Sequence, residues 1–420
     1  MSDFRYDVLV VGAGVAGLCA AVRLAEGGAS VCVLAHGVGS THLAPGTVDV
    51  LGYTPERVAE PARALPAFAD SRPDHPYALL GVDSIAPALD WFAERIARGP
   101  HAGYSYVGGI ERNVLLPTAV GVPRPSALVP ETMARGDLGA DAPLCIVAVP
   151  RLRDLHASLC AANLGRFGIE ARAVELDIGE GRAEVNALGL ARQFDDPTFR
   201  NRVAGRLAPL LRSGERVGLP AMLGLRDPHG AWTDLEERLG QQVFEIPTLP
   251  PSVSGMRVFD ALVAALRAAG GRLVLGAKVV GAERAGARVT TLRTHAGGRD
   301  TVYGADRVVL ASGGFASGGL ALDSDWETHE RVLGLPLRGL PGPGAPRFRP
   351  DYFGEQPMGR VGVAVDGEQR AEGTENVLVA GAALPGAEPW REGSGEGIAI
   401  TSGHRAAGLV LAEAGQAAAA

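Results

Sequence analysis

The chain has 420 residues, 46% of them hydrophobic, with a net charge of −7 and a pI near 5.8. This length predicts two or three domains with sizeable cores, and the acidic balance argues against a nucleic-acid-binding surface. No stretch of about 20 apolar residues is present to span a bilayer, and Asp3 and Arg5 before the first strand do not resemble a signal peptide. We therefore expect a cytoplasmic protein.

The first predicted elements form a βαβ unit with a glycine-rich turn. A buried strand, Val8 to Val11, runs into Gly12-Ala13-Gly14-Val15-Ala16-Gly17, a helical pattern covers Leu18 to Leu24, and a second strand covers Ser30 to Leu34. Gly12 permits the tight turn, Gly14 lets the backbone approach a phosphate, and Gly17 lets the helix pack on the strand. The helix N-terminus offers free N–H groups to that phosphate. The unit predicts a nucleotide site.

The end of the second strand lacks the acid that usually binds an adenosine ribose. The sequence there reads Val33-Leu34-Ala35-His36. Either a backbone group or His36 replaces the acid, or no adenosine ribose is bound, as for a mononucleotide. Spacing alone leaves both interpretations open.

Periodicity predicts a second α/β region in the middle of the chain. Its predicted elements are an amphipathic helix from Ser84 to Arg98, a strand from Leu144 to Val149, a helix from Asp154 to Phe167, a strand from Ile169 to Ile178, and a further element from Arg200 to Leu211. We expect three segments: residues 1–67 as the first part of a nucleotide domain, 68–245 as an inserted α/β domain, and 246–420 as the rest of the nucleotide domain.

The last third returns to the pattern of the first. A helix from Met256 to Ala269 precedes strands at Arg272 to Leu275, Lys278 to Arg284 and Arg288 to Thr294, then a short strand, and then a buried strand that starts at Arg307 and ends in Gly313-Gly314. A loop is predicted from Arg338 to Pro350. Another strand, Asn376 to Gly381, leads to Glu392-Gly393-Ser394-Gly395-Glu396-Gly397 and a helix from Ile398 to Leu411.

This arrangement resembles the two-dinucleotide-binding-domain flavoproteins, which bring N-terminal and C-terminal segments together around one flavin. The expected fold is α/β, a Rossmann-like flavin-binding domain with an inserted α/β domain. Cys19, Cys32, Cys145 and Cys160 are far apart, with no Cys-x-x-Cys pair, and the histidines lack metal-ligand spacing. We expect no metal and no iron–sulfur cluster.

In the fumarate reductase type of flavoprotein, the loop after the second strand passes the flavin ring and carries a covalent histidine. Here the loop reads Gly39-Ser40-Thr41-His42-Leu43-Ala44-Pro45-Gly46. Aligning its Ala-x-Gly core places Ser40, not His42, at the histidine position. The resemblance therefore implies a noncovalent flavin.

Longer phrases narrow the resemblance. They are Leu116-Pro117-Thr118-Ala119-Val120-Gly121, the stretch from Phe244 to Arg257 that contains Pro247-Thr248-Leu249-Pro250-Pro251-Ser252, the stretch from Ala311 to Leu320, the stretch from His42 to Asp49, and the C-terminal glycine helix. Together they resemble the B subunit of the anaerobic glycerol-3-phosphate dehydrogenase, over about residues 5 to 412. The chain departs from that family in its length at 338–350 and in its Ala-rich tail.

The resemblance implies oxidation of sn-glycerol 3-phosphate to dihydroxyacetone phosphate, with electrons passed to a quinone. It implies FMN, with FAD as the alternative, a catalytic A subunit, and an iron–sulfur C subunit that holds the complex at the inner face of the membrane. The rival interpretations are a self-sufficient FAD-dependent dehydrogenase of the fumarate-reductase or steroid type, and an assembly subunit without flavin.

The candidate site residues follow from these motifs. Cofactor binding is expected at Gly12, Gly14, Gly17, Ser40, Thr41, Gly46, Gly313, Gly381, Gly395 and Gly397. The last three should bring a helix N-terminus to the pyrimidine edge of the flavin, where aligned N–H groups stabilise negative charge. Thr41, His42, Arg257 and Arg391 are candidates for catalysis; the two arginines could clamp a phosphate or carboxylate.

Overall fold

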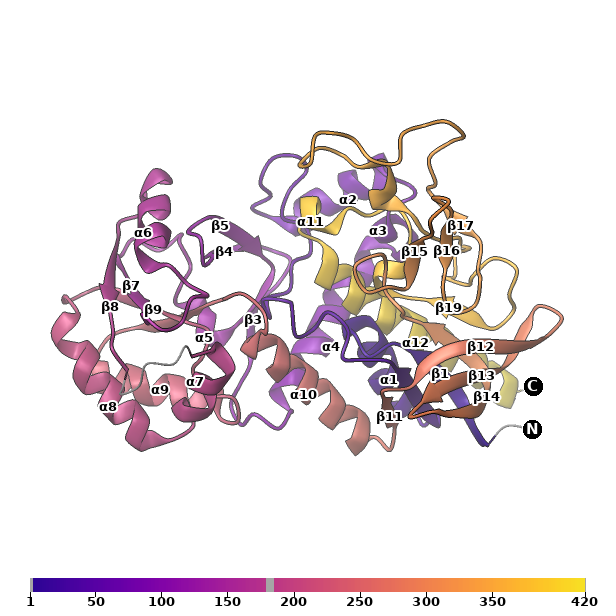
Figure 1. Ribbon diagram of the computed structural model, residues 1–420, viewed down its shortest axis with the longest axis horizontal. Helices are drawn as coiled ribbons and strands as arrows, with labels where there is room; N and C mark the ends of the chain where they lie inside the picture. Colours follow the sequence, from indigo (N-terminus) through magenta and orange to yellow (C-terminus); the bar gives the residue numbers. More distant parts are fainter. Residues whose placement is uncertain (1–2, 179–184, 420) are drawn as a thin grey trace.

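The larger sheet joins the two ends of the chain. In this computed structural model, which describes residues 3–178 and 185–419, its order is β11-β2-β1-β14-β13-β12, with β19 also paired to β14 (Figure 1). Its strands are β1 (Phe4–Val11), β2 (Val31–Ala35), β11 (Arg272–Leu275), β12 (Lys278–Ala285), β13 (Arg288–Ala296), β14 (Arg299–Leu310) and β19 (Val377–Val379). The predicted short strand before Arg307 is therefore the first part of β14.

The centre of this sheet is parallel, as buried strands joined by crossovers should be. β1 pairs with β14 in the register Val10↔Val309 and with β2 in the register Val10↔Val33. One edge of β14 changes partner along its length, because its first half pairs antiparallel with β13 and its end pairs parallel with β19. The carboxyl ends of β1, β14 and β19 consequently meet at one edge, where parallel sheets bind ligands.

Four long helices cover one face of the larger sheet. They are α1 (Val15–Glu26), α4 (Ile85–Ala97), α10 (Val253–Ala268) and α12 (Gly395–Ala419). Their apolar faces share one core with alternate residues of β1 and β2, including Val8, Val10 and Val33. Ser252 begins α10 by accepting a hydrogen bond from the N–H of Gly255 at 3.0 Å, as an N-cap serine does. None of the helices in the described part of the chain is both long and apolar enough to cross a membrane.

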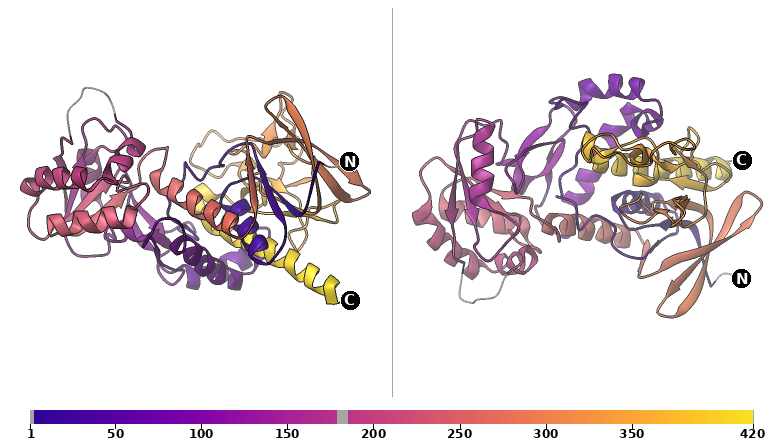
Figure 2. Two further views of the ribbon diagram at one scale, coloured as in Figure 1. Left: turned by 90° about the horizontal axis from the view of Figure 1, so that it is seen from below. Right: turned by 45° about the horizontal axis from the view of Figure 1, so that its top comes forward.

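A second, four-stranded sheet forms a separate body in the order β10-β9-β7-β8, and all its pairs are parallel. Its strands are β7 (Leu144–Ala148), β8 (Ala171–Glu175), β9 (Arg216–Pro220) and β10 (Val243–Ile246), with helices α6 (Ala157–Arg166), α7 (Ala187–Phe194), α8 (Pro197–Leu207) and α9 (Pro228–Leu239). α6 packs on one face and α7, α8 and α9 on the other, so two cores flank the sheet. Figure 2 shows this body apart from the larger sheet in both views.

Short elements complete the chain. They are α2 (Pro61–Ser71), α3 (Pro76–Leu80), β3 (Tyr106–Gly108), β4 (Val114–Pro117), β5 (Pro123–Ser126), β6 (Leu128–Pro130), α5 (Glu131–Ala134), β15 (Leu320–Leu322), β16 (Thr328–Glu330), β17 (Leu337–Arg338), β18 (Gly362–Val363) and α11 (Pro389–Glu392), with 3-10 turns at Val82–Ser84, Ala208–Leu210, Pro357–Arg360 and Gly381–Ala383. The expected boundary after residue 67 falls inside α2. Leu65, Phe68 and the apolar face of α4 belong to the core of the larger sheet, so residues 61–97 lie with the first body and the second sheet begins at β7.

Candidate functional site

The turn between β1 and α1 has the geometry of a phosphate cradle. A Cβ on Gly12, whose φ is +109°, would lie 2.2 Å from the carbonyl oxygen of Ala311, and one on Gly17 would lie 2.1 Å from the carbonyl oxygen of Gly12. A Cβ on Gly14 would meet nothing within 4 Å. Gly14 is also the N-cap of α1, where no side chain caps the helix and the first turn carries no acid. Open space therefore faces uncapped N–H groups, the arrangement that binds a phosphate.

The loop after β2 lies on the N-terminus of α10. A Cβ on Gly255 would lie 1.9 Å from the carbonyl oxygen of Thr41, and one on Gly46, whose φ is +85°, would lie 2.4 Å from Cβ of Ser254. Ser40 is exposed and its carbonyl oxygen closes the turn by accepting from the N–H of Ala44 at 3.1 Å. The two glycines thus let the loop and the helix approach within backbone contact.

Thr41 and His42 face different surroundings within this loop. Thr41 is 2% exposed, and its Oγ1 is buried with no partner among the described residues. The His42 ring packs edge-on against Phe259 with 5.1 Å between centroids, and its Nε2 is also unpartnered there. Burial lowers the pKa of His42, although Asp260 opposes the shift. Buried polar groups normally have partners, so Thr41 Oγ1 and His42 Nε2 are free for a ligand.

The carboxyl ends of β14 and β19 complete the edge. Gly313 adopts φ +80°, and the Oγ of the preceding Ser312 is buried without a partner in the described residues. Gly381 adopts φ +71°, its N–H donates to Ser402 Oγ at 2.8 Å, and a Cβ there would lie 2.8 Å from Cβ of Ala16. Gly381 therefore allows the turn after β19 to lie directly against α1.

The glycines that open α12 serve two purposes. A Cβ on Gly395 would make only ordinary contact, 3.4 Å from Pro389, whereas one on Gly397 would lie 2.5 Å from the hydroxyl of Tyr77. The N–H of Gly397 donates to the carbonyl oxygen of Asp49 at 3.0 Å. Gly397 thus positions the helix, and the N–H of Glu396 before it is directed at the carboxyl group of the same residue.

The residues at this edge fit a flavin. Open space at Gly14 accommodates a phosphate, unpartnered hydroxyls of Thr41 and Ser312 can hydrogen-bond to a polar ring or ribityl chain, and the N-terminus of α12 lies beside the same edge. A narrow cleft is lined by Val15, Thr41, Ala44, Gly46, Thr47, Val48, Phe92, Tyr106, Gly255, Val258, Glu396 and Ile400. The structure therefore brings residues from both ends of the chain to one cofactor site.

Arg257 lies outside this site as a buried structural charge. Its side chain has no exposed surface and pairs with Glu245, with NH1 2.7 Å from Oε2 and NH2 3.0 Å from Oε1. Its remaining donors go to the carbonyl oxygens of Leu223 and Gly224. The expectation that Arg257 could clamp a substrate is thus corrected, because its guanidinium is held by internal partners.

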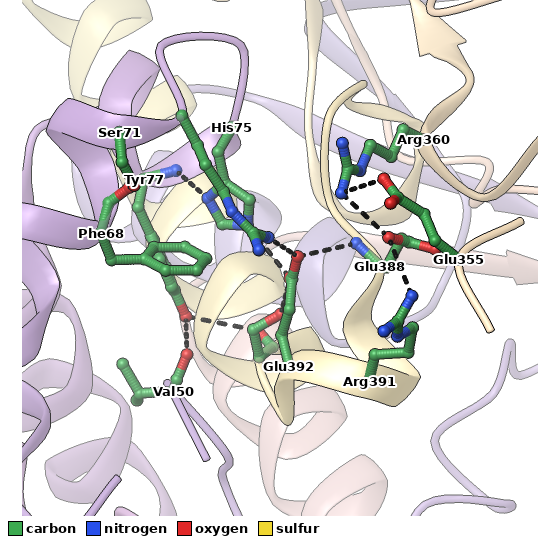
Figure 3. Close-up of polar contacts among 12 residues, drawn as sticks. Val50, Phe68, Ser71, His75, Tyr77, Glu355, Arg360, Glu388, Arg391 and Glu392 are labelled. Atoms are coloured by element: carbon green, nitrogen blue, oxygen red, sulfur yellow. Dashed lines mark hydrogen bonds and ion pairs between the residues drawn. The ribbon is translucent and has the colours of Figure 1, made fainter. Parts of the chain in front are cut away.

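Arg391 lines a cleft of about 350 Å³ with two further arginines. Figure 3 shows Arg360 and Arg391 directed toward Glu388, and His75 toward Glu392. The Glu388 and Glu392 side chains are only 3% and 5% exposed, whereas those of Arg72, Arg360 and Arg391 are 37%, 39% and 35% exposed. Glu355 also lines the cleft, is 48% exposed and lies 2.6 Å from Arg360, so the accessible charge of this arginine cleft, named for Arg72, Arg360 and Arg391, is three arginines against one glutamate.

Glu392 fixes the floor of the arginine cleft. It accepts from Arg72 NH1 at 2.9 Å, from His75 Nε2 at 3.1 Å and from Ser394 Oγ at 2.9 Å. His75 Nδ1 accepts from the N–H of Tyr77, so its proton is on Nε2. Burial alone would raise the pKa of Glu392, but the hydrogen bonds that its carboxylate accepts from His75, from the N–H of Glu388 and from Ser394 outweigh it and the pKa is lowered. By contrast, Arg391 NH1 lies 4.0 Å from Glu388, and its guanidinium lies over the ring of Trp390 at 5.8 Å.

Comparison with known proteins identifies the family. Residues 7–398 match a family model described as an FAD binding domain. The probable B subunit of the anaerobic glycerol-3-phosphate dehydrogenase of Halobacterium salinarum is 33% identical, over 97% of this chain and 98% of that protein. The corresponding B subunit from Yersinia enterocolitica is 31% identical, over 95% of this chain and 96% of that protein.

The chain belongs to the family of anaerobic glycerol-3-phosphate dehydrogenase B subunits. It is a flavoprotein subunit of an oxidoreductase, and the expected flavoprotein fold is confirmed. Among solved structures, a flavocytochrome c3 fumarate reductase in an open conformation is similar over 98% of this chain and 79% of that chain, with 11% identity and a TM-score of 0.45.

The thiols of this flavoprotein lie apart in cores. Burial raises the pKa of Cys32, Cys145 and Cys160 to about 11, and all four cysteines are free and buried. In the described residues, one group has metal-ligand geometry, the exposed Asp323, Glu327 and His329. Asp323 Oδ1 there accepts from the N–H groups of Asp325 and Glu327, and Oδ2 lies 2.7 Å from His329 Nε2. These contacts account for the cluster as a turn.

Sequence reasoning missed three charged residues beside the cofactor site: Asp49, Arg124 and Glu396. Arg124 Nε donates to Asp49 Oδ2 at 2.8 Å, and Glu396 lines the narrow cleft next to them. The one available signal was a glutamate between the glycines of Gly395-Glu396-Gly397. Nothing in the local sequence indicated that residues 49, 124 and 396 would meet.

Proposed function

We propose that this chain carries the flavin that takes electrons from sn-glycerol 3-phosphate and passes them toward a quinone. The observation that carries the proposal is the 31–33% identity over 95–97% of the chain with named B subunits. In this proposal a catalytic A subunit and an iron–sulfur C subunit complete the enzyme at the inner face of the membrane. The described residues supply a cofactor edge, and the buried, separate cysteines support placing the one-electron relay in a partner.

Reconstitution tests this division of labour. The chain alone should give little or no quinone reduction with glycerol 3-phosphate, a soluble dye should be reduced once the A subunit is added, and quinone reduction should also need the C subunit. Rapid glycerol 3-phosphate–quinone turnover by this chain alone would instead establish a self-sufficient dehydrogenase.

The flavin we propose is FMN, noncovalently bound. The support is Ala35 at the end of β2, where an acid would bind an adenosine ribose; the description of the matching family as an FAD binding domain supports the alternative, FAD. Heat release and chromatography of the purified protein decide between them. Stoichiometric FAD would overturn the mononucleotide argument and leave the flavoprotein assignment intact.

We also place the substrate phosphate in the arginine cleft. The cleft volume of about 350 Å³ exceeds the size of a three-carbon phosphate, and Arg391 has the least engaged guanidinium of its three arginines. Calorimetric binding of glycerol 3-phosphate to the isolated chain should be weakened at least tenfold by Arg391→Gln and unchanged by Arg98→Gln, which alters a surface arginine that follows α4. Binding only by the A subunit would contradict this placement.

A further inference from the structure

Glu396 is a half-buried acid that lines the narrow cofactor cleft, where the charge of Arg124 and its own backbone N–H act on its carboxyl group. It lies in the first turn of α12, and the cleft it lines also contains Thr41, Gly46, Tyr106 and Gly255. No side chain in the described part of the chain donates a hydrogen bond to its carboxyl group. An acid that no side chain holds by a hydrogen bond, in the same cleft as the buried and unpartnered Thr41 Oγ1, is a candidate for a functional role at a cofactor edge.

The ionisable groups around Glu396 are already committed. Asp49, which is 1% exposed, accepts from Arg124 Nε at 2.8 Å and from Ser126 Oγ at 2.6 Å. The hydroxyl of Tyr77 donates to the carbonyl oxygen of Val50 at 2.7 Å, and that of Tyr106 donates to the carbonyl oxygen of Gly46. Each of the two tyrosine hydroxyls would lose the hydrogen bond that it donates if it lost its proton.

The environment holds Glu396 near the point of ionisation at neutral pH. Burial raises the pKa of Glu396 to about 7, and the charge of Asp49 adds to the shift, while Arg124 and the backbone N–H of Glu396 oppose it. Burial likewise raises the pKa of Tyr77 and Tyr106. Among the groups that face the cleft, Glu396 is therefore the one whose proton occupancy changes most readily.

We infer that Glu396 exchanges the proton that accompanies flavin reduction in this subunit. The inference rests on the proposed function, because it takes the edge formed by the loop of residues 40–46 and the start of α12 as the place of the flavin ring. When two electrons enter the flavin, the added negative charge favours the neutral carboxyl, and Glu396 takes one proton from solvent. When the two electrons leave for the next carrier, the carboxyl returns that proton to solvent, so charge and protons balance.

Two measurements test this inference. In flavin-free protein labelled with ¹³C at glutamate Cδ, the resonance absent from Glu396→Gln should titrate near neutral pH; titration in the ordinary carboxyl range would overturn the inference. In flavin-loaded protein, spectroelectrochemistry should show a pH interval near neutrality in which two-electron reduction takes up one additional proton. Within that interval the midpoint potential should fall more steeply with pH than on either side of it. One additional proton per two electrons changes the equilibrium constant of reduction tenfold per pH unit, which corresponds to a slope of about 30 mV per pH unit.

The variants separate this role from a structural one. Glu396→Gln should bind flavin and lose the extra slope, whereas the exposed Glu237→Gln on α9 should keep it. A structural acid would alter flavin affinity and leave the slope unchanged, which would overturn the inference. Failure of the wild-type protein to bind any flavin would instead contradict the proposed function itself, so the two failures are distinguishable.

Discussion

At the scale of single residues, the glycines of the first turn have unequal tasks. A Cβ on Gly12 or Gly17 would lie 2.2 or 2.1 Å from a backbone carbonyl oxygen, which is too close for any side chain. Gly14, by contrast, faces open space. The first two are therefore required by the fold. Gly14 is required only by what binds next to it, which makes it the better position for testing the cofactor.

Gly14→Val should abolish flavin binding while the protein folds. A valine there occupies the space of the phosphate, and its Cβ has no atom within 4 Å outside the adjoining residues of its own chain segment. The flavin absorbance of the purified variant should be lost, with a circular dichroism spectrum like that of the wild type. Gly17→Val is the matched comparison, because its Cβ collides with the Gly12 carbonyl and should reduce soluble yield. Retained stoichiometric flavin in Gly14→Val would contradict the site.

Glu396 should make the stability of the protein depend on pH. Its folded-state pKa is about 7 against an ordinary value of 4.5, so the folded chain holds a proton that the unfolded chain releases. The free energy of unfolding then falls as pH rises from 4.5 to 7, by up to about 3 kcal/mol. Thermal unfolding of flavin-free Glu396→Gln should lose less stability than the wild type over that interval. Parallel profiles would show that Glu396 ionises normally.

At the scale of elements, one buried ion pair connects the second sheet to the helix layer of the first. Glu245 on β10 pairs with Arg257 on α10, and it also accepts from Thr132 Oγ1 at 2.7 Å and from the N–H of Leu223 at 2.8 Å. Arg257 in turn lies over the ring of Tyr104 at 5.4 Å. Five separate segments thus meet at two charges whose side chains have no exposed surface.

Arg257→Ala should destabilise the chain by about 3–5 kcal/mol, because Glu245 would be left as an uncompensated buried charge. Urea denaturation followed by tryptophan fluorescence measures the change. Arg238→Ala breaks a surface ion pair with Asp234 within α9 and should shift the midpoint little. A small effect of Arg257→Ala would mean that water or another donor reaches Glu245.

The elements that the sequence predicted have strong periodicity, and those it missed do not. Val8 to Val11 and the amphipathic helix from Ser84 to Arg98 correspond to β1 and α4 within a few residues. β9 begins with Arg216 and ends with Pro220, so it does not look like a buried strand. The element expected from Arg200, whose type the sequence left open, is the helix α8; it begins at Pro197, where the Asp196 side chain accepts from the N–H of Thr198.

The sequence predicted those parts of the site that are built from residues close together in the chain. The glycines at residues 12, 14 and 17 are adjacent in sequence, and their spacing carries the chemistry. The environment of Glu396 depends on Asp49 and Arg124, which only the folded chain brings to it. For Arg257 the prediction was wrong in the opposite direction: the sequence suggested an arginine available to a ligand, but its guanidinium is paired with Glu245. The sequence does not reveal whether an arginine is buried against an internal partner or exposed to a ligand.

At the scale of the whole molecule, membrane association should depend on partners. In the described residues no helix is long and apolar enough to cross a membrane. Because the proposed function assigns membrane attachment to the C subunit, we expect the isolated chain to remain in the supernatant after ultracentrifugation and to pellet with membranes only when its partner subunits are coexpressed. Pelleting of the isolated chain that resists high salt would show that it binds lipid by itself.

The pairing of β1 with β14 also sets a constraint on biosynthesis. Val10 on β1 lies beside Val309 on β14, so the central strand of the larger sheet acquires its neighbour only after about 300 further residues have been made. At 5–20 residues per second this delay is roughly 15–60 s. The second sheet, whose strands span residues 144–246, is complete well before then and can fold on the ribosome. During the interval the apolar strand Val8 to Val11 has β2 but no β14, which makes the newly made N-terminal unit a natural client for chaperones.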